Sequence, residues 1–199
     1  RDDARLLVVF CSERHDLHEL LGAINLESGR VPLIGCSTAG EIVGTVVRDD
    51  TLVVCVARFE HTTLQWSAFA VDEVARSRGV GRTLARALDG PDLRAVFVLS
   101  EGLHVNGTEL VAGLNEVLPE RVVVTGGLAG DGTRFAETWV CVGTTVRSRF
   151  VAAVGLYGDQ LVVTHGSRGG WDAFGPERTI TRSEGNVLYE IDGKPALAL

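Results

Sequence analysis

Residues 31–41 read VPLIGCSTAGE, and this stretch sets the pattern from which the fold can be predicted. An apolar run is followed by five small residues and a glycine, and then by the carboxylate of Glu41. Small residues directly after a strand let the backbone approach a neighbour closely. Upstream, residues 5–12 (RLLVVFCS) have the continuous apolar character of a strand buried on both faces. Leucines at helical spacing in residues 16–24 lie between the two runs, so the sequence predicts a strand-helix-strand unit.

The second half of the chain repeats this pattern. Its Ala-Gly-Asp, which ends at Asp131, aligns with the Ala-Gly-Glu that ends at Glu41. We interpret the likeness as an internal duplication, with halves of about 5–72 and 93–166. The corresponding elements are a predicted strand at 93–102 (LRAVFVLSEG), a helix at 106–118 and a second strand with its glycine-rich turn at 121–132 (RVVVTGGLAGDG).

The remaining segments complete an α/β (α+β) fold. A helix is predicted at 74–88, and one more strand, or a strand and a helix start, beyond residue 179. We expect mixed sheets with the helices outside, related by a pseudo-twofold axis and layered α-β-β-α. The other predicted strands are an antiparallel series at 41–47, 50–60 and 62–71, and strands at 138–143, 149–158 and 160–167.

Composition narrows the class of protein. The 199 residues include 19 basic and 26 acidic side chains, a net charge of −7, which argues against nucleic acid and anionic membranes as partners. No apolar stretch reaches the roughly 18–20 residues that span a bilayer, and the charged start does not read as a secretory signal. The four cysteines form no Cys-x-x-Cys pair, which favours free thiols in a reducing compartment. We therefore expect a cytoplasmic location.

The two glycine-rich turns are the predicted ligand site. Each leaves the carboxyl end of a strand, where ligands tend to bind in α/β sheets, and a pseudo-twofold axis could bring the two together. Carboxylates would receive an ammonium group, and N–H groups and hydroxyls an anion, which suits a small polar or zwitterionic ligand. The alternative is that the glycines serve only tight turns and close packing. The predicted ligand-binding residues are Gly35, Cys36, Ser37, Thr38, Gly40, Glu41, Gly126, Gly127, Gly130 and Asp131.

Other chemistries have weaker support. Cys36 could act as the nucleophile of an acyl-transfer enzyme with a histidine base, but no spacing singles out a pair. The GGLAGDG stretch lacks the spacing of a dinucleotide loop, and no Gly-Lys-Ser/Thr forms a P-loop. His15 and His18 have helical spacing suitable for a metal, but they flank charged residues and are typical of a solvated surface. We therefore predict no catalytic residue and no metal site.

Several blocks of sequence resemble the FIST domain, an intracellular signal-transduction sensory family. They are GCSTAGEI, GLHVNGTELVAGLNEVLP, VTGGLAGDGTRFAETWVCVG, VAAVGLYG and GWDAFGPERTITRSEGNVLYEIDGKPAL, and they occur in the family's order. Residues 1–174 resemble the FIST N-terminal sensory domain. Residues 175–199 resemble a linker and the start of the companion FIST C-terminal region, which would be truncated here.

The resemblance implies a non-enzymatic sensor of a small molecule, such as an amino acid. Its implied partners are the companion FIST C-terminal region and an output protein such as a histidine kinase, a chemoreceptor or a cyclic-dinucleotide enzyme. Some similar proteins are described as haem proteins that sense nitric oxide. Haem is therefore an alternative cofactor, with His104 and His165 as the axial-ligand candidates.

Overall fold

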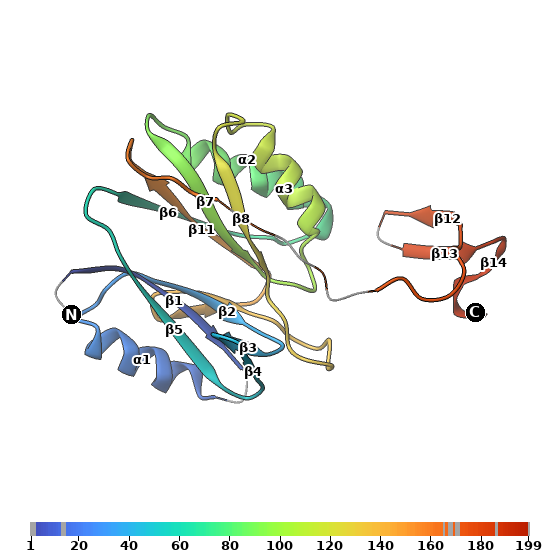
Figure 1. The fold of residues 1–199 in the computed structure, drawn as a ribbon, viewed down its shortest axis with the longest axis horizontal. Coiled ribbons are helices and arrows are strands. Elements are labelled where there is room, and N and C mark those ends of the chain that lie inside the picture. Colours follow the sequence, from blue (N-terminus) through green and yellow to red (C-terminus); the bar gives the residue numbers. More distant parts are fainter. Residues whose placement is uncertain are drawn as a thin grey trace. The chain divides into compact units, whose positions relative to one another are not determined.

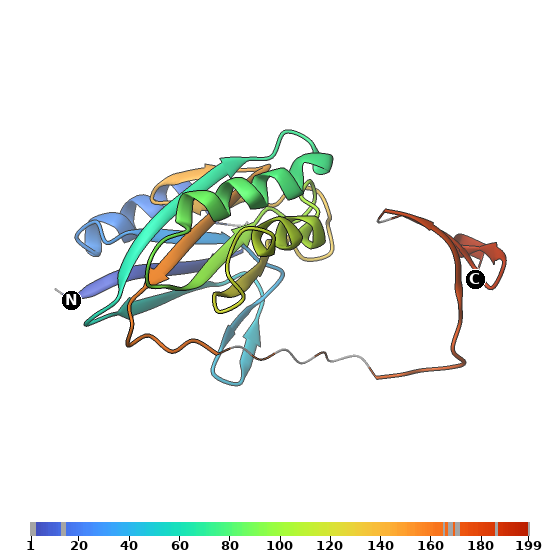
Figure 2. The same ribbon diagram turned by 90° about the horizontal axis from the view of Figure 1, so that it is seen from above.

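The computed structural model describes residues 3–12, 15–164, 166, 169, 172–185 and 187–198. The chain divides into two compact units, Arg1–His165 and Gly166–Leu199, and each is described by itself. Figures 1 and 2 show the larger unit from two sides, with its helices and two sheets. None of the helices among the described residues is long and apolar enough to cross a membrane.

Two mixed sheets form the larger unit. The first sheet has the order β10 (Thr145–Arg147), β9 (Val140–Val142), β2 (Leu33–Ser37), β1 (Ala4–Cys11) and β5 (Leu52–Arg58). The second has the order β6 (Thr63–Ala70), β11 (Phe150–Tyr157), β7 (Leu93–Ser100) and β8 (Val123–Leu128). A separate hairpin consists of β3 (Glu41–Val43) and β4 (Val46–Arg48).

Each sheet contains one parallel pair, β1–β2 in the first and β7–β8 in the second. In both cases a helix connects the paired strands, and a later strand, β5 or β11, lies antiparallel on the other side of the first strand. This agrees with the predicted fold class. The duplication and its pseudo-twofold axis stay predictions.

The two halves of the chain also exchange strands. β6 belongs to the first half but pairs with β11 in the second sheet, and β9 belongs to the second half but pairs with β2 in the first. The antiparallel series predicted for residues 41–71 is therefore wrong in its pairing. β3 and β4 pair only with each other in the described residues, β5 pairs with β1, and β6 crosses to the other sheet.

The helices cover the outer faces of the sheets, as Figure 1 shows. α1 (Leu17–Glu27) packs on the first sheet through Leu21, which shares a buried cluster with Leu7 and Val9 of β1. α2 (Ser77–Leu88), preceded by the 3₁₀ turn η1 (Val74–Arg76), and α3 (Gly107–Asn115) pack on the second sheet. A third cluster, which includes Ile34 and Leu99, fills the space between the sheets. The predicted α-β-β-α layering is confirmed.

Close packing of α2 on α3 explains two glycines. A Cβ atom added at Gly81 would lie 2.2 Å from the carbonyl oxygen of Leu110, and one added at Gly113 would lie 2.1 Å from that of Arg78. Both approaches are too short for a side chain. Gly81 therefore supports the packing of the two helices, although glycine lowers helix propensity.

The smaller unit contains the strands β12 (Ile180–Glu184), β13 (Val187–Ile191) and β14 (Lys194–Pro195), and the 3₁₀ turn η2 (Ala196–Ala198). The strand predicted at 160–167 is wrong for residues 160–164, which lie in no strand. The expected domain boundary after residue 174 stays a prediction.

Candidate functional site

The two glycine-rich turns meet in the structure. The backbone N–H of Gly130 donates a hydrogen bond to the carbonyl oxygen of Ser37, with 3.0 Å between nitrogen and oxygen. A Cβ atom added at Gly130 would lie 3.1 Å from the backbone nitrogen of Ala39. The contact lies at the C-terminal end of β2 and just beyond that of β8. It joins the first half of the chain to the second.

A polar cavity of about 320 Å³ opens between these turns. We call it the acidic hollow, because its lining includes four carboxylates and one guanidinium group. It is lined by Ser12, Thr38, Ala39, Gly40, Glu41, Asp49, Asp50, Asp131, Gly132, Thr133 and Arg134. Four of the ten predicted ligand-binding residues, Thr38, Gly40, Glu41 and Asp131, therefore line one cavity.

Glu41 stabilises the first turn from within. Its side chain is buried, and its carboxylate accepts hydrogen bonds from the hydroxyl of Thr38 and from both the backbone N–H (3.0 Å) and the hydroxyl (2.6 Å) of Thr51. Burial alone would raise the pKa of Glu41, but these hydrogen bonds outweigh it and the pKa lies below its usual value. The carboxylate is therefore ionised at neutral pH and already has protein donors.

Asp131 has the same role in the second turn. Its carboxylate accepts hydrogen bonds from the backbone N–H groups of Ala136 (2.7 Å) and Glu137 (3.1 Å). Burial opposes ionisation, yet the hydrogen bonds lower the pKa of Asp131 below its usual value. These bonds close the loop 131–137, which carries Arg134 to the edge of the acidic hollow.

Two further carboxylates of the hollow were not predicted as ligand residues. Asp49 is exposed and accepts no hydrogen bond from the residues that the structure describes. Asp50 accepts a long hydrogen bond, 3.5 Å, from the hydroxyl of Ser12. The sequence signal is the Asp-Asp pair at 49–50, which lies at the junction of the strands predicted at 41–47 and 50–60. It lies in the hollow because the β3–β4 hairpin leads the chain back toward the end of β2.

The residues at the end of β2 are structural. Ser37 is fully buried, donates its backbone N–H to the carbonyl oxygen of Trp139 and accepts the N–H of Trp139 on its hydroxyl oxygen, each at 3.1 Å. Gly35 lies against β1, and a Cβ atom there would be 2.4 Å from the carbonyl oxygen of Val9. Neither Gly35 nor Ser37 lines the acidic hollow.

Cys36 is unsuited to nucleophilic attack in this structure. Its side chain is 3% exposed, and burial raises the pKa of its thiol to about 12. The thiol is therefore protonated at neutral pH and shielded from solvent. The geometry gives no support to acyl transfer through Cys36.

The glycines of β8 also lie outside the acidic hollow. Gly126 has a φ of +147°, and a Cβ atom there would lie 1.7 Å from the carbonyl oxygen of Val98. Gly127 is exposed, with no atom near its Cβ position. Gly126 thus meets a packing requirement, which was the alternative that the sequence left open.

His104 is fixed by a buried carboxylate. Its ring Nδ1 lies 3.4 Å from Oε1 of Glu101, and its backbone N–H donates to Oε2 at 2.7 Å. Glu101 is fully buried and also accepts from Leu103 N–H and the Thr138 hydroxyl, which outweighs burial and lowers its pKa. His104 does not line the acidic hollow, and His165 lies outside the described residues. In the described part of the chain, no group of histidines, cysteines and carboxylates could hold a metal ion.

Comparison with known families agrees with the resemblance drawn from the sequence. Residues 5–194 match the model of the FIST N domain. The match covers nearly the whole chain, so the chain belongs to the FIST N domain family, which is a signal-transduction sensory family. No curated protein sequence matches the chain.

Proposed function

We propose that this member of the FIST N domain family binds an amino acid, or a similar small zwitterion, in the acidic hollow. In this proposal the domain is a non-enzymatic sensor located in the cytoplasm. It passes the binding event to a fused or neighbouring output protein, such as a histidine kinase, a chemoreceptor or a cyclic-dinucleotide enzyme.

One observation carries the proposal. The two turns meet around a single cavity whose lining has four carboxylates and one guanidinium group. A volume of about 320 Å³ is at the small end of the range of about 300–1,000 Å³ that is typical of small-molecule sites. The excess of negative charge favours a ligand with an ammonium group, and Arg134 can receive a carboxylate at the same time.

The residues of the hollow divide into two roles in this proposal. Glu41 and Asp131 already accept hydrogen bonds from the protein, so they shape the turns and contribute negative charge. Asp49, which is exposed and has no donor among the described residues, is the group that takes the ammonium. Arg134 takes the carboxylate, because guanidinium and carboxylate form paired charge-assisted hydrogen bonds.

The same loop offers a route for the signal. The carboxylate of Asp131 closes the loop 131–137. Trp139 follows this loop, and its backbone N–H and carbonyl oxygen both form hydrogen bonds with Ser37 in the other half of the chain. A ligand that binds Arg134 and Asp49 together links this loop to the β3–β4 side of the hollow. Such a link favours one arrangement of the two turns, which is what a sensor needs.

Isothermal titration of the 199-residue chain with the standard amino acids tests the proposal. We expect Asp49→Asn to weaken binding about tenfold or more, since a hydrogen bond to a charged group contributes about 1.5–3 kcal/mol. Removal of the ammonium by N-acetylation of the amino acid should have the same effect on the wild-type chain. Arg134→Gln should instead reduce the preference for amino acids over simple amines.

Asp159→Asn is the matched control. Asp159 is also exposed, but it follows β11 at the end of the strand that is remote from Glu101 and the two turns. Its substitution should leave binding unchanged. If no amino acid binds the wild-type chain at millimolar concentration, or if Asp49→Asn binds with full affinity, the proposed site is wrong.

A further inference from the structure

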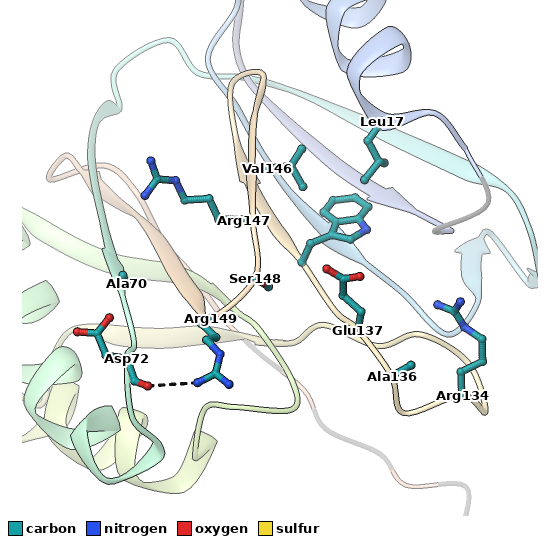
Figure 3. A pocket seen from close by; sticks show the side chains of 11 residues that line it. Leu17, Ala70, Asp72, Arg134, Ala136, Glu137, Val146, Arg147, Ser148 and Arg149 are labelled. Atoms are coloured by element: carbon teal, nitrogen blue, oxygen red, sulfur yellow. Dashed lines mark hydrogen bonds between the residues drawn. The ribbon is translucent and has the colours of Figure 1, made fainter.

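A second and larger cavity of about 980 Å³ is lined in part by Arg134, Ala136 and Glu137 of the 131–137 loop. We call it the basic hollow, because three guanidinium groups line it, from Arg134, Arg147 and Arg149, against two carboxylates. In Figure 3, Leu17 and Val146 lie on one side of this hollow, and Arg149 and Asp72 lie on the other. A local excess of positive charge is notable in a chain whose net charge is −7.

Two of the arginines have no carboxylate partner among the described residues. Arg149 donates to the backbone carbonyl oxygen of Asp72 at 3.2 Å, and the guanidinium carbon of Arg147 lies 5.7 Å from the centre of the Phe150 ring. The carboxylate of Asp72 instead lies 3.9 Å from Arg76. Both guanidinium groups therefore keep N–H donors for an incoming anion.

An apolar floor lies next to these charges. Leu17, Val146 and Trp139 contribute to it, and Trp139 is 6% exposed. The indole Nε1 of Trp139 is the one buried side-chain polar atom that lacks a hydrogen-bond partner in the described part of the chain. An unmade hydrogen bond at a buried donor is costly, so a ligand whose ring carries an acceptor should bind here more tightly than one with a plain phenyl ring.

We propose that the basic hollow is a second binding site, which takes a small organic anion. The ligand has a carboxylate or phosphate group attached to an apolar or aromatic body. Arg147 and Arg149 bind the anionic group, because arginine matches the planar oxygen geometry of both anions. The body of the ligand packs on Leu17, Val146 and Trp139.

The two hollows have opposite charge and share Arg134. The basic hollow is therefore distinct from the acidic hollow in ligand chemistry, and this inference does not depend on the function proposed above. Arg147 and Arg149 line only the basic hollow, and Asp49 lines only the acidic hollow. Substitutions can consequently address each site separately.

Titration with three probes that share a phenyl ring, and with inorganic phosphate, tests the inference. Benzoate and phenyl phosphate carry an anion on a phenyl ring, benzamidine carries a cation on the same ring, and inorganic phosphate supplies the anion alone. We expect both aromatic anions to bind, to change the fluorescence of Trp139 and to bind more weakly at high salt. A difference between benzoate and phenyl phosphate tells which anion the hollow prefers, and weaker binding of inorganic phosphate measures the contribution of the floor.

The double variant Arg147→Gln/Arg149→Gln should weaken binding of the aromatic anions at least tenfold. Both side chains are exposed, so the variant should keep the wild-type circular dichroism spectrum. Arg121→Gln, an exposed arginine just before β8, is the control and should bind as the wild type does. Trp139→Phe should retain binding but lose the fluorescence change. The inference is overturned if benzamidine changes the fluorescence of Trp139 as benzoate does, if the double variant binds the aromatic anions with full affinity, or if neither aromatic anion binds.

Discussion

The two parallel strand pairs, β1–β2 and β7–β8, share a local sequence pattern but differ in how much of their second strand is buried. In β1–β2, Gly35 lies opposite Val9, and in β7–β8, Gly126 lies opposite Val98. In each pair the glycine allows the backbone of the second strand to pass the carbonyl oxygen of the valine. A Cβ atom added at the glycine would lie 2.4 Å from that oxygen in the first pair and 1.7 Å from it in the second. Yet all of β2 is buried, while the last three residues of β8 are exposed.

Strand exchange causes this difference. β9, from the second half of the chain, pairs with the free side of β2 and makes it a central strand. Among the residues that the structure describes, β8 pairs only with β7, so it is the edge of its sheet. Similar local sequences therefore acquire different roles, because a distant segment decides which strand is covered. The polar groups that line a cavity come from the turns that follow the strands.

The largest expected effect separates two adjacent glycines of β8. Gly126→Ala should destabilise the fold by about 3 kcal/mol or more, because its Cβ would lie 1.7 Å from a backbone oxygen and its φ of +147° strains any side chain. Gly127→Ala should be neutral or slightly stabilising, since no atom lies within 4 Å of its Cβ position. Urea denaturation followed by circular dichroism measures both.

Gly35→Ala extends the comparison to the central strand. Its Cβ would lie 2.4 Å from the carbonyl oxygen of Val9, so it should also destabilise the fold strongly. Equal midpoints for Gly126→Ala and Gly127→Ala would contradict the packing account of the first. If Gly35→Ala were as stable as the wild type, the close packing of a glycine on a valine would not be a shared requirement of β1–β2 and β7–β8.

The sequence predicted the positions of helices and strands better than it predicted which strands pair with each other. The strands at 5–12 and 93–102 and the helices at 16–24 and 106–118 are close to the observed β1, β7, α1 and α3. Apolar periodicity and capping residues carry that information, and in the structure Asp16 and Asn106 cap their helices. Pairing depends on contacts between residues far apart in the chain, which periodicity does not encode. The crossing of β6 and the insertion of β9 were missed for this reason.

The sequence also predicted part of the placement of the candidate site, while ligand binding by these residues stays a prediction. The meeting of the two turns followed from the likeness of the halves, and Glu41 and Asp131 do line one cavity. Asp49, Asp50 and Arg134 were missed, because their place depends on the path of the β3–β4 hairpin and of the loop after Asp131. The basic hollow was missed as well, since its arginines come from segments that do not resemble a binding motif.

Buried carboxylates provide the next comparison, between Glu41 after β2 and Glu101 after β7. The pKa of each is lowered, so each binds a proton more readily in the unfolded chain than in the folded one. Their contribution to stability is therefore complete above the usual pKa of about 4.5 and is lost as the pH falls from there through the lowered pKa. We expect the free energy of unfolding of the wild-type chain to decrease over this acid range.

Glu101→Gln and Glu41→Gln should each make this acid dependence shallower. Each should also cost about 1–3 kcal/mol at neutral pH, because an amide group is placed against donors that a carboxylate satisfied. Urea denaturation between pH 3 and pH 7 measures both effects. Glu60→Gln, at an exposed position, is the control and should keep the wild-type slope. An unchanged slope in both variants would show that other carboxylates dominate acid unfolding.

The smallest expected effect compares thiols in a central and an edge strand. Cys36 of β2 and Cys55 of β5 are both in the first sheet, but Cys36 is buried with a pKa raised to about 12, and Cys55 is exposed at the sheet edge. Iodoacetamide at pH 8 should therefore alkylate the exposed Cys55 in the folded chain and leave Cys36 unmodified until the chain unfolds. Mass spectrometry of digests taken over time follows each site, and Cys55→Ser confirms the assignment.

Rapid alkylation of Cys36 in the folded chain would mean that the end of β2 opens to solvent. It would also return the acyl-transfer alternative to consideration, because a reactive thiol would then lie next to the acidic hollow.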